Sequence, residues 1–146
     1  MTESTTRNLG KYEILEEIGQ GGFATVYKAR DTTLERTVAL KILRRELLHD
    51  PVFVERFKAE AKMAAQLEHP NIVPIYEVGE FQGVHYLAMQ YVEGQTLTEV
   101  LKVRGQLTVQ QALKIMQDVA AALDEAHRKG MIHRDIKPSN ILIRKD

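Results

Sequence analysis

The glycine-rich stretch Ile18–Tyr27 most restricts how this chain can fold. Its G-x-G-x-x-A pattern suits either the start of a dinucleotide-binding fold, which requires a helix directly after the glycines, or the turn of a β-hairpin. The residues that follow, Ala24–Ala29, are rich in strand formers. The stretch therefore predicts a glycine-rich hairpin. No G-x-x-x-x-G-K-[ST] segment occurs in the chain, which argues against a P-loop enzyme.

Further strand signals lie on both sides of a helical segment. Apolar and β-branched runs separated by turn residues predict strands at Tyr12–Ile18, Phe23–Arg30, Arg36–Leu43, Ile72–Glu80 and Val84–Gln90. Helical patterns dominate after Gln90. The chain is therefore expected to form a small β-rich lobe joined to the start of a helical one.

A single lysine, Lys41, interrupts the apolar strand Thr37–Leu43. A buried ammonium group costs free energy unless an anion pairs with it, so this position predicts an anionic partner. The alternative is an edge-strand lysine whose head group reaches solvent.

A helix is predicted to begin at Asp50 and Pro51, because Asp50 can cap it and Pro51 suits its first turn. This helix carries a carboxylate that could pair with Lys41. At about 100° per residue, Glu60 falls in the middle of an apolar stripe made of Phe53, Phe57, Ala64 and Leu67. We expect an ion pair between Lys41 and Glu60. The alternative is a half-exposed glutamate at the rim of the stripe.

A long helix is predicted from Thr108 to Lys129. Thr108 and Gln111 form a capping box at its start, and Gly130 ends it. One face is apolar and consists of Ala112, Met116, Val119, Leu123 and Ala126. His127 lies near that face, and we interpret it as a core histidine rather than a catalytic one.

Composition excludes several classes of function. Lysine plus arginine and aspartate plus glutamate both number 20, so charge predicts neither nucleic acid nor a membrane surface as a partner. The chain has no cysteine, and therefore no disulfide framework or thiolate metal site. No run of apolar residues approaches a signal core or a membrane span. These features fit a cytoplasmic protein.

The stretch His133–Asn140 carries the strongest chemical signal. It matches the catalytic-loop pattern H-R-D-x-x-x-x-N letter for letter. A plain surface turn is the alternative, because Arg-Asp and Lys-Pro pairs are common in loops. The glycine-rich stretch, the lysine strand and the glutamate helix precede it in the matching order. On these motifs the chain resembles the eukaryotic-type serine/threonine protein kinases, with Ala24 in place of the third loop glycine.

The resemblance implies a role for each matching residue. In that family the aspartate of the catalytic loop accepts the substrate proton, the lysine neutralises the transferred phosphoryl group and the asparagine holds magnesium. These roles fall to Asp135, Lys137 and Asn140. The implied ATP-binding residues are Ile18, Gly19, Gly21, Val26, Ala39, Lys41, Glu60, Met89, Gln90, Val92 and Leu142. ATP and Mg²⁺ are thus the implied cofactors.

The same resemblance predicts the organisation of the chain. It implies an α+β kinase-like fold in which a five-stranded antiparallel N-lobe with one major helix precedes a helical C-lobe. The expected parts are a tail at 1–11, the N-lobe at 12–89, a hinge at 90–95 and a partial C-lobe at 96–146. No D-F-G segment follows Asn140, so we expect a truncated and inactive domain. The alternative is a non-catalytic kinase-like module that binds nucleotide or protein.

The resemblance also implies partners. A kinase of this type acts on proteins that offer serine or threonine hydroxyls. We further expect self-association, because apolar faces of the long helix and of the strand ending at Ile143 lack the elements that would cover them.

Overall fold

The computed structural model describes residues 7–131 and 136–145. These divide into two compact units. The first consists of residues 7–66 and 74–91, and the second of residues 67–73, 92–131 and 136–145. The fold is α+β, as predicted.

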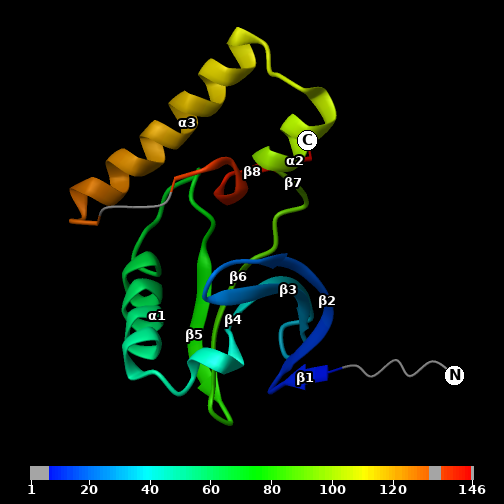
Figure 1. Cartoon of the computed structure of the whole chain (residues 1–146), viewed down its shortest axis with the longest axis vertical. Helices are drawn as coiled ribbons and strands as arrows, with labels where there is room; N and C mark the ends of the chain where they lie inside the picture. Colours follow the sequence, from blue (N-terminus) through cyan, green and yellow to red (C-terminus); the bar gives the residue numbers. More distant parts are fainter. Residues whose placement is uncertain (1–6, 132–135, 146) are drawn as a thin grey trace, which may run out of the picture. The chain divides into compact units, whose positions relative to one another are not determined.

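A six-stranded antiparallel sheet with the order β1-β2-β3-β4-β6-β5 forms the first unit (Figure 1). Its strands are β1 (Arg7–Leu9), β2 (Tyr12–Gln20), β3 (Ala24–Asp31), β4 (Arg36–Leu43), β5 (Ile75–Phe81) and β6 (Val84–Gln90). A short 3-10 helix, η1 (Arg45–Leu47), leads from β4 to the helix α1 (Pro51–Ala64). Asp50 caps α1 as predicted, since its carboxylate accepts a hydrogen bond from the Val52 N–H at 3.0 Å.

The prediction of five strands is wrong by one. Arg7–Leu9, assigned to a tail by the sequence, forms β1 and pairs with β2. Gly10 allows the chain to reverse there, because its φ of 60° lies in the left-handed region that favours glycine.

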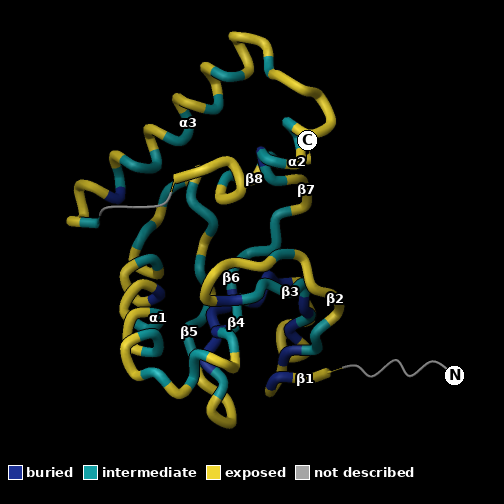
Figure 2. Tube along the Cα trace, in the orientation of Figure 1, coloured by how far each residue is buried: buried dark blue, intermediate teal, exposed yellow. Residues whose placement is uncertain are grey.

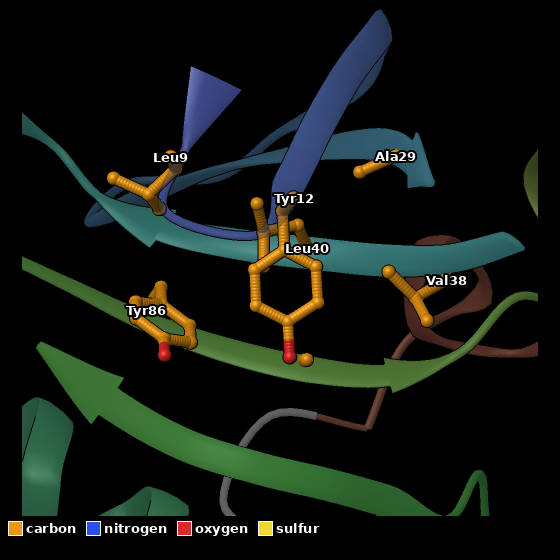
Figure 3. Close-up of a cluster of buried hydrophobic side chains, with 7 residues drawn as sticks. Leu9, Tyr12, Ala29, Val38, Leu40 and Tyr86 are labelled. Atoms are coloured by element: carbon orange, nitrogen blue, oxygen red, sulfur yellow. The ribbon is translucent and has the colours of Figure 1, made fainter. Parts of the chain in front are cut away.

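The core of the first unit lies on one face of this sheet. It is made of Leu9, Tyr12, Ala29, Val38, Leu40, Tyr86 and Ala88, six of which are labelled in Figure 3. The two tyrosine rings meet edge to face at 5.6 Å between centroids. The buried segments in Figure 2 lie mainly along these strands.

The carboxylate of Glu77 in β5 interacts with the hydroxyl groups of both tyrosines. The Tyr12 hydroxyl donates a hydrogen bond to Glu77, and the ammonium of Lys11 lies 3.4 Å from the same carboxylate. Burial first, and then the hydrogen bond to Glu77, raise the pKa of Tyr12 well above its ordinary value. Burial and the negative charge of Glu77 also raise the pKa of Tyr86.

In its described residues, the second unit holds two α-helices, one 3-10 helix and a small sheet. Its elements are β7 (Gly94–Thr96), α2 (Leu97–Arg104), α3 (Val109–Arg128), η2 (Pro138–Asn140) and β8 (Leu142–Arg144). The predicted capping box at Thr108 is confirmed, since Thr108 and Gln111 exchange hydrogen bonds at 3.0 and 3.1 Å. No described helix is both long and apolar enough to cross a membrane.

The segment 67–73 belongs with this second unit through Asn71. Its side-chain amide donates to the Asp118 carbonyl in α3 at 3.0 Å, while its N–H donates to the His69 imidazole. The interpretation of His127 as a core residue is wrong, because His127 is exposed. The buried residue at that end of α3 is its neighbour Ala126.

Candidate functional site

Lys41 lies on the sheet face opposite the tyrosine core. In the strand register it pairs with Val26 of β3 on one side and with Leu87 of β6 on the other, and Ala39 pairs with Met89. Side chains alternate between faces along a strand, and residues directly opposite one another share a face. The predicted residues Val26, Ala39, Lys41 and Met89 are therefore gathered on one face, with Leu87 among them.

The glycine-rich stretch is a hairpin between β2 and β3, as predicted. Gly19 pairs with Val26, and the Gly21 N–H donates to the Ala24 carbonyl at 2.9 Å. Ile18 is 45 % exposed beside it. A Cβ added at Gly22 would meet no atom within 4 Å, so the backbone of this turn is open to an approaching group.

The hairpin is tied to the elements that follow β4. The Phe23 carbonyl accepts a hydrogen bond from the Arg44 N–H at 2.9 Å. The Phe23 ring packs on Phe53 of α1 at 5.3 Å, and the guanidinium of Arg56 lies 5.6 Å from the Phe23 ring. The hairpin tip thus contacts α1 through one aromatic side chain.

The predicted ion pair between Lys41 and Glu60 is absent. Glu60 instead pairs with Arg56 at 3.5 Å, and its side chain is 71 % exposed. Within the described part of the chain, no carboxylate lies within 4.0 Å of the Lys41 ammonium. Lys41 is therefore a half-buried cation that has no ion pair with the residues in 7–131 and 136–145.

The physical reason is the orientation of α1. Its buried residue is Ala61, one position and about 100° beyond Glu60. The sequence predicted an apolar stripe through Phe53 and Phe57 with Glu60 at its centre. In the structure, the buried face of α1 is centred on Ala61 instead. Arg56 and Glu60 are four residues apart, and this spacing in the sequence could have predicted their ion pair.

The remaining predicted residues lie at the strand end and in the second unit. Gln90 ends β6 and donates its N–H to the Pro74 carbonyl at 3.0 Å, while Val92 begins the second unit. Lys137 and Asn140 are exposed; Lys137 precedes η2 and Asn140 ends it, and the Asn140 N–H donates to the Lys137 carbonyl at 2.9 Å. Asp135 lies outside the described residues.

Pairing of β7 with β8 fixes the chain that follows Asn140. Leu142 pairs with Thr96 and Arg144 with Gly94. A Cβ at Gly94 would lie 2.0 Å from the Ile143 carbonyl oxygen, so only glycine permits this approach. The Leu97 N–H adds a bond to the Ile141 carbonyl at 2.8 Å. Among described residues, no group of three or more acidic or histidine side chains could hold a metal ion.

Comparison with known proteins gives one consistent result. A family model described as "Protein kinase domain" matches residues 12–146. Serine/threonine-protein kinase PrkC of Bacillus subtilis is 49% identical over 134 residues, which cover 92% of this chain and 21% of PrkC. Serine/threonine-protein kinase PknH of Mycobacterium tuberculosis is 47% identical over 137 residues, which cover 94% of this chain and 22% of PknH.

Solved structures agree with these relatives. The crystal structure of the Mycobacterium tuberculosis PknI kinase domain matches with a TM-score of 0.84 and 32% identity, covering 99% of this chain and 59% of that one. The chain thus spans about a fifth of the length of the curated relatives it matches.

Proposed function

Because the chain belongs to the serine/threonine protein kinase family, we propose that the protein containing it transfers the γ-phosphate of ATP to serine and threonine hydroxyls of proteins. The face around Lys41 would bind the nucleotide. The observation that carries this proposal is the ammonium of Lys41, which pairs with no carboxylate in the part of the chain that the structure describes and lies next to an open glycine hairpin among apolar neighbours. A half-buried cation of this kind suits a polyphosphate.

The residues of the first unit suit both the phosphates and the base of ATP. The hairpin backbone at Gly19 and Gly21 lets N–H groups approach phosphates closely, while Val26 and Ala39 offer an apolar surface to a flat base. The backbone carbonyl of Gln90 and the N–H of Val92 would bind the adenine edge, behind Met89. Leu142 stays among the proposed ATP-binding residues, as an apolar contact for the base.

The catalytic step falls to the segment that holds Asp135, Lys137 and Asn140. Asp135 would accept the proton of the substrate hydroxyl, and Lys137 would offset charge on the moving phosphoryl group. Asn140 would hold Mg²⁺, which supplies further charge neutralisation. The proposed organisation is an N-lobe at 12–89, a hinge at 90–95 and a partial C-lobe at 96–146. The proposed location is the cytoplasm.

A nucleotide titration of the chain tests the proposal. We expect addition of Mg-ATP to shift the NMR signals of Val26, Ala39, Leu87 and Met89, which share the face of Lys41. Lys41→Met should weaken this binding about tenfold or more, since it removes one charge-assisted contact. Lys58→Met is the matched control, because Lys58 lies on α1, where it pairs with Glu55 at 3.7 Å. Equal losses in both variants, or shifts confined to the opposite face, would contradict the assignment.

A further inference from the structure

A pocket of about 480 Å³ lies in the first unit, away from the proposed nucleotide face. Its apolar floor includes Ile14, Ile42 and Val84, which also pack against the tyrosine core. Ile42 pairs with Thr25 and Tyr86, whereas the adjacent Lys41 pairs with Val26 and Leu87. Because neighbouring residues of a strand point to opposite faces, this pocket and Lys41 lie on opposite sides of the sheet.

Three arginines line this pocket: Arg7 from β1, and Arg44 and Arg45 after β4. Two carboxylates, Glu17 and Glu46, also line it. Among described residues, none of the three guanidinium groups has a carboxylate within 4.0 Å. The glutamates therefore do not neutralise the arginines by contact, and positive charge remains in excess.

One of the lining residues, Arg44, has a hydrogen-bond donor that is not satisfied. Its Nε is buried and has no hydrogen-bond acceptor, the one such side-chain atom found among the described residues. A buried donor without an acceptor costs free energy, and a guanidinium is satisfied best by a carboxylate. The Arg44 backbone is fixed by its bond to the Phe23 carbonyl, so the side chain starts from a defined position.

We propose that this pocket is a second ligand site, which binds a small carboxylic acid with an apolar body. The carboxylate accepts from Arg44, with Arg7 and Arg45 adding positive charge, and the apolar body covers Ile14, Ile42 and Val84. The volume lies within the roughly 300–1,000 Å³ of small-molecule sites. The site is separate from the proposed kinase function and does not depend on it.

The test uses 3-phenylpropionate as the probe and 3-phenylpropanamide as its uncharged match, added to the 146-residue chain. Methyl signals of Ile14, Ile42 and Val84 should shift with the acid, and the amide should bind about tenfold more weakly. Arg44→Gln should abolish this difference between acid and amide. Arg30→Gln should retain it, because Arg30 lies outside the pocket and faces Glu35 at 3.7 Å.

Three results would overturn the site: equal affinity for acid and amide, shifts confined to Ala39 and Met89, or full discrimination in Arg44→Gln. Circular dichroism of both variants reports whether the sheet is intact. Arg45→Gln provides a second variant should Arg44→Gln not fold, and it should reduce the preference for the acid. If the pocket does not bind the acid, the result of the ATP titration still stands, because that titration reports on the opposite face of the sheet.

Discussion

At the scale of single residues, we expect Lys41 to contribute to nucleotide binding but not to the stability of the fold. Its ammonium is half-buried and has no ion pair with any described residue, so it adds a desolvation cost to the folded state. We expect Lys41→Met to leave the free energy of unfolding unchanged or raise it by up to about 1 kcal/mol, while nucleotide binding falls. Denaturant unfolding measures this. A loss of more than about 1 kcal/mol would show that Lys41 has a structural partner.

The tyrosine pair predicts the response to alkaline pH. The pKa of Tyr12 and of Tyr86 is raised in the folded state, so the unfolded chain loses these protons first, near the ordinary tyrosine value of about 10. The contribution of these two tyrosines to the free energy of unfolding should therefore be constant below about pH 10 and fall above it. Tyr12→Phe should make this fall shallower, and the exposed Tyr76 gives a matched Tyr76→Phe control. An identical slope in both variants would contradict the account.

At the scale of elements, Gly79 in β5 tests the packing of the sheet. A Cβ at this position would lie 2.6 Å from the Tyr86 hydroxyl oxygen, so Gly79→Ala must displace a core tyrosine. We expect a loss of about 1 to 3 kcal/mol in the free energy of unfolding. Gly22→Ala is the control, since its Cβ meets no atom within 4 Å. Equal stability of the two variants would mean that Tyr86 is not held against β5.

The elements also show what the sequence could predict. β4 and β6 have their predicted bounds, because each is a run of mainly apolar and β-branched residues. β1 was missed, since three residues carry no periodicity and form a strand only by pairing with β2. The resemblance gave both Lys41 and Ala39 as ATP-binding residues, and the register of β4 places the two on one face. Glu60 was misplaced because the buried face of α1 depends on tertiary packing around Ala61, which apolar residues alone do not define.

At the scale of the whole molecule, α3 carries an exposed apolar stripe. Val109, Leu113 and Met116 are 74, 56 and 66% exposed and recur at helical spacing. We expect the isolated chain to self-associate through this stripe. Leu113→Glu with Met116→Glu should restore a monomer in light scattering, whereas the exposed Gln117→Glu should not. A monomeric unmodified chain would contradict this expectation.

Phosphoryl transfer tests the central claim most directly. A chimera would join this chain to the part of Bacillus subtilis PrkC that follows the matched region, and labelled ATP would report phosphate on serine and threonine of a generic protein substrate. We predict that Asp135→Asn lowers turnover by roughly two to four orders of magnitude and spares ATP affinity. The exposed Asp124→Asn, which only loosens a contact with Arg128, should leave turnover unchanged. Wild-type turnover in Asp135→Asn would contradict the assignment of this chain as the catalytic part of a protein kinase.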